Sequence, residues 1–374
     1  MSNTIPGNMR AVDVRGGSGP ATALFINDAI PLPPVARGEV LVKVKVFGIN
    51  RGDMLQRDGE YPGISHLTKI MGLEFSGTIA HTHEEDDGVQ DGEKWKVGDE
   101  VFGLLYGGGY AEYVNINKKM LIRKPKELSF EVTGGLCEAW FTALQALFFV
   151  GQYDPTTTRS ILWHAGASAV SVAGIQLSRD AHLIAAAEAQ ATTNDGTADT
   201  NILAPRVFAT ARKQAKCDFT VSHLGATGAV DLTQHPDKKS WTSEVRNELN
   251  GGQGVDLVVD FLGGPYLEAN LDVLAIDGRI VQLGWLDGPV APAPVSIAAV
   301  LAKRACIQGS QLRSRSLEYQ VKLRDFFVRN VLPRLVNGQF EHVVERVVPW
   351  EKVQEAHELL EANQTKGKVV CIID

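Results

Sequence analysis

The sequence has few cysteines, and none of them lies close to another. Only four occur among 374 residues, and no CxxC pair is present. A structural zinc site or a disulfide framework needs cysteines at short spacing, so neither is expected. We predict isolated reduced thiols in a protein that stays inside the cell. The four cysteines are Cys137, Cys217, Cys306 and Cys371.

A surplus of basic residues is missing as well. The formal net charge is −7 at pH 7, so nucleic acid is not an expected partner. No run approaches the roughly 20 consecutive apolar residues that span a membrane. The N-terminus also lacks the basic start and apolar stretch of a signal peptide. We therefore expect a cytoplasmic protein without a membrane partner.

What is present is enough material for two domains, each with its own core. Hydrophobic residues make up 44% of the chain and charged residues 22%, which is ordinary for a globular protein. Internal repeats and low-complexity tracts are not found in the sequence.

The first third of the chain is predicted to be rich in β-strands. Apolar and polar residues alternate over 40–46, which indicates a strand with one buried face, and a second strand is expected over 98–105. The acidic stretch between them, 81–95, has no apolar periodicity and is predicted to be a solvated loop. His81 and His83 beside four acidic residues are compatible with a metal site, but a polar loop is the simpler interpretation.

From about residue 135, predicted strands alternate with helical segments, which is typical of a parallel sheet. A further helix, strand and helix follow residue 310, and the chain closes with a terminal strand within KGKVVCIID. The predicted strands are 160–164, 206–211, 255–260, 279–283, 305–309 and 345–348, and the predicted helices after residue 310 are 317–330 and 352–362.

The segment Ile161–Arg179 predicts a nucleotide-binding turn. It consists of a short apolar strand, a turn of small residues and a helix with an apolar face. Such a turn directs backbone N–H groups and the positive end of the helix at a pyrophosphate. A βαβ unit without a ligand is the alternative.

Six segments lie in order along almost the whole chain: NRGDMLQRDGEYPG, GGGYAEYV, EAWFTALQAL, VDFLGGPYLEANLDVLAIDGRIVQLG, GSQLRSRSLEYQ and VQEAHELLEANQTKGKVV. Together they resemble the medium-chain dehydrogenase/reductase superfamily. The resemblance is closest to its zinc-free quinone oxidoreductase branch, the relatives of zeta-crystallin, and especially to the tumour-suppressor-inducible quinone oxidoreductase subgroup.

The resemblance implies an α/β fold with two domains. A Rossmann-type domain with a doubly wound parallel sheet is expected over 135–312. A β-rich GroES-like catalytic domain is expected over 1–134, and the C-terminal segment 313–374 returns to complete it. The family also implies a homodimer.

Two positions set the metal chemistry. In the zinc alcohol dehydrogenases of the superfamily, a Cys and a His-Glu pair hold the catalytic metal. This sequence resembles that pattern with Asn50 in place of the Cys and Leu73 in place of the His, which leaves Glu74 without fellow ligands. Zinc needs three or four converging ligands, so hydride transfer without zinc is predicted.

The turn departs from the family pattern at two positions. Ala169 and Ser171 stand where quinone oxidoreductases usually have glycine. The second glycine of such a loop lets backbone approach the phosphate, and the third allows close packing of helix and strand. Ala and Ser are the smallest substitutes, so weaker cofactor binding is expected rather than none.

Two predicted strands are candidates for the one whose end contacts the adenosine ribose. The segment 182–187 ends at Glu188, where an acid would bind the ribose 2′-OH of NADH. The segment 206–211 ends before Arg212, Lys213 and Lys216, which favour the 2′-phosphate of NADPH. The family resemblance continues better through the residues that follow the second segment than through those that follow the first. NADPH is therefore predicted, NADH is the alternative, and 190–205 becomes a polar insertion.

The resemblance also assigns individual residues. Asn50 and Tyr61 are placed at the nicotinamide and substrate pocket, where they would hydrogen-bond the developing oxyanion. Tyr61 as the cap of a turn, and Lys368 as an ordinary surface lysine, are the alternatives. The expected cofactor-binding residues are Thr142, Gly166, Ala167, Ser168, Ala169, Val170, Arg212, Lys216, Gly263, Leu283, Gly284, Gln311, Leu312, Arg313 and Lys368, with Lys368 near the phosphates.

These features predict an NADPH-dependent quinone oxidoreductase that contains no zinc. An electron-poor quinone or conjugated enone would accept hydride directly from the nicotinamide ring. Tyr61 or solvent is the expected proton donor. An enone or enoyl reductase of detoxification or secondary metabolism is one alternative, and a cofactor-binding protein with little turnover is another.

Overall fold

The computed structural model describes residues 5–61, 68–82, 94–185 and 204–374. They form two compact units. The β-rich unit comprises Met1–Ala139 and Arg313–Asp374, and the parallel-sheet unit comprises Trp140–Leu312. The units thus divide after residue 139, whereas the predicted domains divide after 134, and both schemes divide after 312.

The β-rich unit contains a seven-stranded sheet and a two-stranded ladder of β1 and β2. The order of the larger sheet is β14-β15-β3-β4-β5-β7, and β6 pairs with β3. In β3, Lys43 and Lys45 are exposed and alternate with buried valines, as the sequence pattern predicts. The strands are β1 (Asn8–Val14), β2 (Leu24–Pro31), β3 (Glu39–Gly48), β4 (Glu74–Thr82), β5 (Glu100–Leu104), β6 (Tyr113–Asn117), β7 (Leu121–Arg123), β14 (Val344–Pro349) and β15 (Lys368–Ile372).

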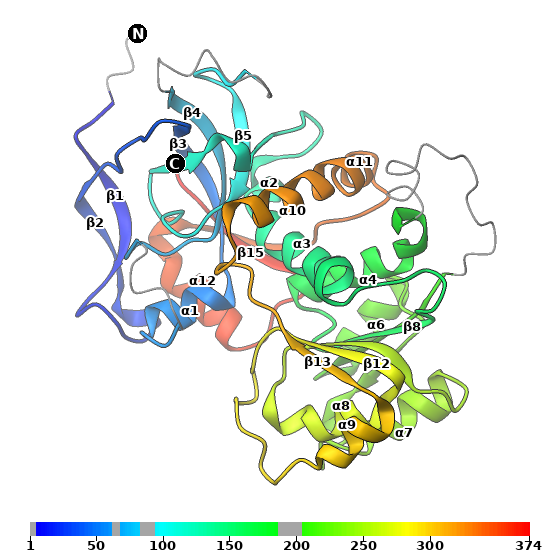
Figure 1. Ribbon diagram of the computed structural model, residues 1–374. Coiled ribbons are helices and arrows are strands. Elements are labelled where there is room, and N and C mark those ends of the chain that lie inside the picture. Colours follow the sequence, from blue (N-terminus) through cyan, green and yellow to red (C-terminus); the bar gives the residue numbers. More distant parts are fainter. Residues whose placement is uncertain (1–4, 62–67, 83–93, 186–203) are drawn as a thin grey trace, which may run out of the picture. The chain divides into compact units, whose positions relative to one another are not determined.

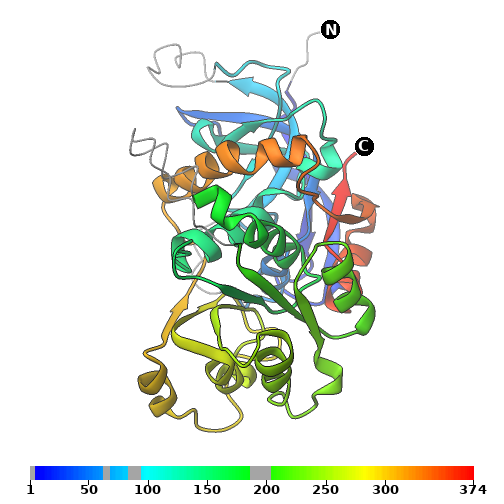
Figure 2. The ribbon, with the colours of Figure 1, turned by 90° about the vertical axis from the view of Figure 1, so that its right-hand side faces the viewer.

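Strands from the two ends of the chain pair in this sheet. The last strand, β15, runs antiparallel to β3, with Cys371 opposite Phe47. Figure 1 and Figure 2 show the red C-terminal strand beside the blue N-terminal strands. The C-terminal segment therefore completes the sheet, as the resemblance implies. The helices of the unit are α1 (Arg51–Arg57), α2 (Phe130–Thr133), α10 (Leu317–Asn330), α11 (Leu332–Val336) and α12 (Val353–Glu361), and α3 (Cys137–Leu144) crosses the boundary between the units.

The parallel-sheet unit contains six parallel strands in the order β10-β9-β8-β11-β12-β13. Counted along the chain, this order is 3-2-1-4-5-6, the doubly wound arrangement of dinucleotide-binding folds. The predicted fold class is confirmed. The strands are β8 (Ser160–Trp163), β9 (Arg206–Ala211), β10 (Gly228–Asp231), β11 (Val255–Asp260), β12 (Leu274–Gln282) and β13 (Cys306–Gly309), and the helices are α4 (Ala169–Arg179), α6 (Gln214–Ser222), α7 (Trp241–Ser243), α8 (Leu267–Val273) and α9 (Ile297–Lys303).

Helices cover both faces of this sheet (Figure 1). Neighbouring residues of β8 face opposite sides: Leu162 joins the apolar cluster that contains Trp241, whereas Trp163 packs against α4. A Cβ at Gly174 of α4 would lie 2.4 Å from the Trp163 ring, so only glycine allows this contact. The core thus forms two layers, one on each side of the sheet.

Most predicted elements appear, and three with the predicted bounds: β9, β11 and α10. Strand β12 begins at Leu274 rather than 279. The pair Asp277–Gly278 indicates a turn, but Asp277 adopts a left-handed φ of 63° and the register of β11 and β12 shifts within the strand. The chain therefore continues through a bulge.

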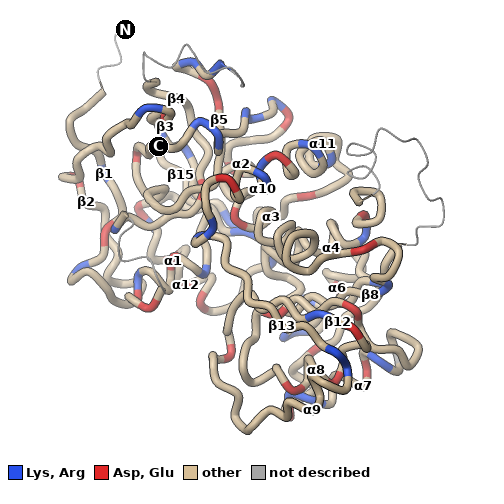
Figure 3. The backbone as a smooth tube through the Cα atoms, in the orientation of Figure 1, with Lys and Arg blue, Asp and Glu red and all other residues tan. Residues whose placement is uncertain are grey.

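The competing ribose strand over 182–187 does not form where the chain is described, because 181–185 are helical. Glu188, His83 and positions 190–203 of the insertion lie outside the described residues. Within the described ranges, no helix is both long and apolar enough to cross a membrane. Among the described residues, basic and acidic positions are interspersed along both units (Figure 3).

Candidate functional site

A buried ion pair lies beside Asn50, one of the two positions at which the resemblance implies a lost zinc ligand. The Lys368 ammonium contacts the Glu74 carboxylate and donates to Asn50 Oδ1 at 2.6 Å. Asn50 Nδ2 in turn donates to Glu74 Oε1 at 2.9 Å. Glu74 is completely buried and Lys368 is 2% exposed. The two buried charges therefore neutralise each other, and partly buried Asn50 bonds both of them.

The local backbone explains why these side chains meet. Asn50 follows β3 and caps α1, where its N–H donates to Asp53 Oδ2 at 2.8 Å. Glu74 begins β4 and Lys368 begins β15, and both strands pair with β3. A Cβ at Gly48 would lie 2.2 Å from Glu74 Oε1, so the ion pair requires glycine at that position.

The same residues do not fit a zinc ion. Asn50 and Leu73 offer no thiolate or imidazole, and Leu73 is buried among apolar side chains. The remaining possible ligand, Glu74, is already neutralised by the Lys368 ammonium. No cluster of three metal-ligating side chains occurs within the described part of the chain. Zinc needs three or four converging ligands, and this donor set cannot supply them.

The structure places Lys368 in the buried ion pair with Glu74. Its ammonium lies in the β-rich unit between Asn50 and Glu74, and the expected position near the cofactor phosphates stays a prediction. The alternative of a surface lysine is wrong, because the side chain is buried.

Behind Asn50 runs a chain of buried polar groups. Asp53 accepts hydrogen bonds from Gly72 N at 3.0 Å and from the Tyr110 hydroxyl at 3.0 Å. The Tyr110 oxygen lies 3.2 Å from His357 Nε2, and Arg57 donates to His357 Nδ1 at 3.3 Å. Because arginine can only donate, Nδ1 is the acceptor and Nε2 carries the proton. Asn50 is therefore held by a fixed hydrogen-bond chain.

Burial shifts the titration of this chain. Desolvation raises the pKa of Asp53 to about 6, although hydrogen bonds from Gly72 and Asn50 oppose the shift. Desolvation and, to a smaller extent, the charge of neighbouring Arg57 lower the pKa of His357 to about 3. His357 is therefore neutral at pH 7, as the tautomer above requires.

Glu138 is a carboxyl group beside this site whose pKa is raised. Its backbone N–H donates to Glu74 Oε2 at 2.8 Å. Burial and the negative charge of Glu74 raise the pKa of Glu138 to about 8, against the opposing fields of Lys368 and Arg313. At neutral pH the carboxyl group therefore carries a proton. The sequence held no signal for this role, since Glu138 is an ordinary first-turn acid of α3.

Tyr61 lies against Arg313 in the β-rich unit. The Arg313 guanidinium is centred 4.9 Å from the Tyr61 ring, and its Nε donates to Tyr106 O at 2.6 Å. The ring also lies beside Leu73, because both would lie 3.2 Å from a Cβ at Gly52. Tyr61 is thus near the Asn50 turn, and the guanidinium holds its ring.

The turn before α4 suits a pyrophosphate. Ser168 caps the helix, and its Oγ accepts from Ser171 N at 3.3 Å. The first turn of a helix leaves N–H groups without partners inside the helix, and Ser168, Ala169 and Val170 are partly exposed there. A Cβ at Gly166 would lie 2.8 Å from Ala209 Cβ, so this glycine is needed for the turn to pack on β9, next to buried Ala167.

Ser171 is a buried packing residue in this turn. Its hydroxyl donates to His164 O at 2.8 Å and the side chain is fully buried. The hydroxyl thus bonds the carbonyl of the residue that follows β8, and the weaker cofactor binding expected from Ala169 and Ser171 stays a prediction. Its replacement by glycine would remove a hydrogen bond rather than open the site.

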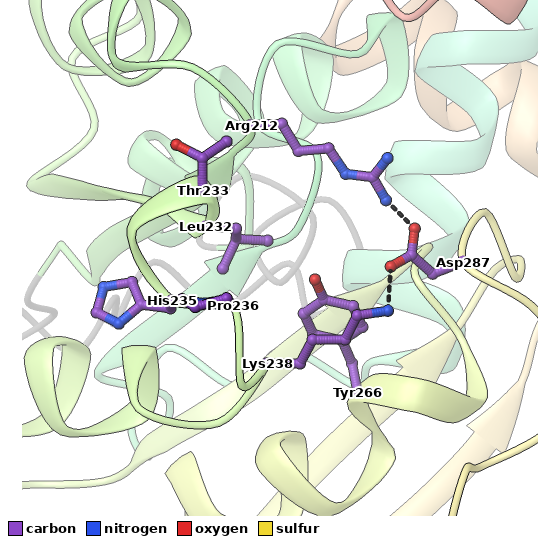
Figure 4. Close-up of a pocket in the computed structure, with 8 residues that line it drawn as sticks. All are labelled: Arg212, Leu232, Thr233, His235, Pro236, Lys238, Tyr266 and Asp287. Carbon is purple, nitrogen blue, oxygen red and sulfur yellow. Dashed lines mark hydrogen bonds and ion pairs between the residues drawn. The ribbon is translucent and has the colours of Figure 1, made fainter.

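A cavity of about 250 Å³ opens at the carboxyl ends of β9 and β10. Arg212 directly follows β9 and Leu232 directly follows β10. Figure 4 shows the Arg212 and Lys238 side chains reaching Asp287 from two sides. Ligands of doubly wound sheets bind outside the carboxyl ends of the strands, so the cavity lies where the adenosine end of a dinucleotide is expected. Its lining is Arg212, Leu232, Thr233, His235, Pro236, Lys238, Tyr266 and Asp287.

Sequence reasoning missed two of these charged groups. Lys238 lies in a turn after β10, and Asp287 lies in the segment after β12. Lys216, which was predicted, is on α6 and does not line the cavity. No motif pointed to Lys238, because a lysine in a polar turn is usually a solvated surface residue.

The other predicted cofactor residues are spread over the parallel-sheet unit. Thr142 lies on α3 and is partly exposed. Gly263 packs on the segment after β12: its φ is 92°, and a Cβ there would lie 2.5 Å from Gly288 O. The remaining positions follow the ends of β12 and β13, where they share the ligand edge of the sheet, and they are Leu283, Gly284, Gln311 and Leu312.

Two family models match the chain. The alcohol dehydrogenase GroES-like domain matches residues 36–126, and the zinc-binding dehydrogenase model matches residues 224–371. The chain belongs to the medium-chain dehydrogenase/reductase superfamily. It is an oxidoreductase of this superfamily.

The relatives of this superfamily member include quinone oxidoreductases. It is 28% identical to quinone oxidoreductase-like protein 2 of Bos taurus, over 93% of this chain and 88% of that protein. It is 26% identical to quinone oxidoreductase of Lama guanicoe, over 98% of each chain. These identities are modest, so the relatives alone do not define the substrate.

Solved structures share the fold over nearly the whole length. A mycobacterial protein complexed with NADPH matches with a TM-score of 0.78 and 24% identity, over 98% of this chain and 100% of that one. An NAD-dependent alcohol dehydrogenase matches with a TM-score of 0.74 and 28% identity, over 98% and 100%. The fold is thus shared by proteins whose names carry different nicotinamide cofactors.

Proposed function

We propose that the protein is a zinc-independent, NADPH-dependent reductase of quinones or conjugated enones. The observation that carries this proposal is the buried Asn50–Glu74–Lys368 cluster. An ammonium group there balances the one carboxylate that remains from the zinc site of related dehydrogenases. The names of the relatives, quinone oxidoreductases among them, support the substrate class.

The parallel-sheet unit would hold the cofactor, which supplies the hydride when bound. The turn at Ser168–Val170 would bind the pyrophosphate with backbone N–H groups. Arg212 and Lys238 would bind the 2′-phosphate through charge-assisted hydrogen bonds. These two cations are the reason to propose NADPH rather than NADH.

The β-rich unit would supply the polar groups for the substrate. Asn50 Nδ2 donates to Glu74 at 2.9 Å, and among the described residues its second hydrogen has the distant acceptor Gly48 O at 3.5 Å. That second hydrogen and the Tyr61 hydroxyl are the donors we propose for the developing oxyanion. Glu138 is the proposed proton donor, in place of the Tyr61 or solvent proton that the sequence suggested.

The protonated Glu138 specifically favours enone reduction. An enone requires a proton on carbon after hydride transfer, whereas a quinone forms a hydroquinone anion that solvent can protonate. Because the pKa of Glu138 is raised to about 8, the group can donate below that pH and loses this ability as the pH rises through it. A cytoplasmic homodimer completes the proposal, from the family resemblance.

Replacing Glu138 with glutamine should separate the two reactions. We expect turnover of a small enone to fall by about a hundredfold, the lower end of general-acid effects, and turnover of a simple quinone to change little. Wild-type enone turnover should decline above about pH 8. Glu131→Gln, an acid of α2 whose pKa is lowered, is the matched control and should leave both activities intact. Equal losses for the two substrates would refute this role of Glu138.

A further inference from the structure

The cavity cations are held by an internal anion. Asp287 Oδ2 accepts from Lys238 Nζ at 2.9 Å, and Asp287 Oδ1 pairs with Arg212. We propose that Asp287 occupies the position of an adenosine 2′-phosphate and competes with it, so that this carboxylate sets how strongly NADPH is preferred over NADH. The inference rests on the proposed NADPH-binding function and adds a specificity-determining residue to it.

The backbone of Lys238 supports a binding role. Its φ of 56° lies in the left-handed region, which is strained for a residue with a side chain. Two hydrogen bonds hold it there: Lys238 N–H donates to His235 O at 3.0 Å, and Trp241 Nε1 donates to Lys238 O at 3.0 Å. Strained residues of this kind gather at ligand sites. The ammonium also lies 5.5 Å from the centre of the Tyr266 ring in the cavity wall.

The backbone at Asp287 is held just as firmly. Its backbone N–H donates to Leu262 O at 3.0 Å, and the neighbouring Leu286 N–H donates to Phe261 O at 2.8 Å. These bonds fasten the turn to the segment that follows β11. The side chain takes no part in them, so it can be changed without loosening the turn.

Electrostatics make the competition specific for a phosphate. The side chains of Arg212 and Lys238 are 45% and 41% exposed, so a ligand can reach them, whereas that of Asp287 is 15% exposed. A phosphate carries more charge than a carboxylate and accepts hydrogen bonds on three oxygens. It can therefore displace Asp287 from both cations. A ribose hydroxyl has no charge to do so.

The test measures binding of 2′,5′-ADP and of ADP to the full-length protein and to Asp287→Asn by titration calorimetry. We expect the variant to bind 2′,5′-ADP about three- to tenfold more tightly, the range of one or two freed surface cations, and to bind ADP as the wild type does. Asp277→Asn is the matched control, because Asp277 pairs with Arg304 in the same unit outside the cavity. It should change neither affinity. Thermal melting of each variant checks that the fold is intact.

Three outcomes would overturn the inference. Unchanged or weaker binding of 2′,5′-ADP by Asp287→Asn would show that the carboxylate does not compete. If the variant bound both nucleotides more tightly by the same factor, the carboxylate would hinder nucleotides in general and not the 2′-phosphate specifically. If neither the wild type nor the variant bound 2′,5′-ADP while both bound ADP, the proposed NADPH function would fail too. If the wild type bound 2′,5′-ADP and the variant bound it equally well, only the role of Asp287 would fail.

Discussion

Replacing Lys368 with methionine should lower the free energy of unfolding by about 3–5 kcal/mol, because the change leaves a buried carboxylate without its cation. Glu74 is fully buried and would keep the hydrogen bonds from Asn50 Nδ2 and Glu138 N, neither of which carries a positive charge. Methionine is close to lysine in length and volume, so the lost stability would come from the unpaired charge and not from a cavity. Urea-induced unfolding of the β-rich unit, followed by fluorescence, measures it.

Two controls isolate the charge effect. Glu74→Gln in the Lys368→Met background should restore most of the lost stability, because a buried neutral amide costs far less than an unpaired ion. Lys43→Met on the exposed face of β3 should change stability by less than about 0.5 kcal/mol. If Lys368→Met unfolded at the same urea concentration as the wild type, the ion pair would not be a structural replacement for a metal.

The second large effect should appear in cofactor choice. Reversing both cavity cations, with Arg212→Glu and Lys238→Glu, should weaken NADPH binding by at least about a hundredfold, because two charge-assisted contacts of about 1.5–3 kcal/mol each are lost. NADH binding should change far less, since it places no phosphate in the cavity. Fluorescence titration with each reduced cofactor measures both constants.

The matched control for this double variant is Lys216→Glu. Lys216 was a predicted phosphate ligand, but it does not line the cavity, so its reversal should cost little. Equal binding of NADPH and NADH by the wild type would contradict the assignment. It would favour the alternative in which Glu188 binds the ribose 2′-OH.

The fold could be predicted because its signals are local. Strand β9 is a short buried run that ends just before charged residues, and the small-residue turn before α4 stands between a strand and a helix with an apolar face. The loss of the zinc ligands was equally visible, since Asn50 and Leu73 occupy positions defined by their neighbours in sequence.

Contacts between distant residues could not be predicted in the same way. Lys368 meets Glu74 only because β15 returns to pair with β3, and that register is a property of the folded sheet. The raised pKa of Glu138 likewise depends on burial beside Glu74. Lys238 was missed because its strained backbone conformation is imposed by tertiary hydrogen bonds rather than signalled by its residue type.

Zinc-independent reduction is tested most directly by steady-state NADPH oxidation with protein that has been treated with a chelator and checked for metals. With a simple quinone or enone as acceptor, we expect less than about 0.1 zinc per chain and turnover unchanged by the treatment, because the donor set lacks the three ligands that zinc requires. One tightly held zinc per chain, with activity lost on its removal and restored by its return, would show instead that the enzyme depends on zinc.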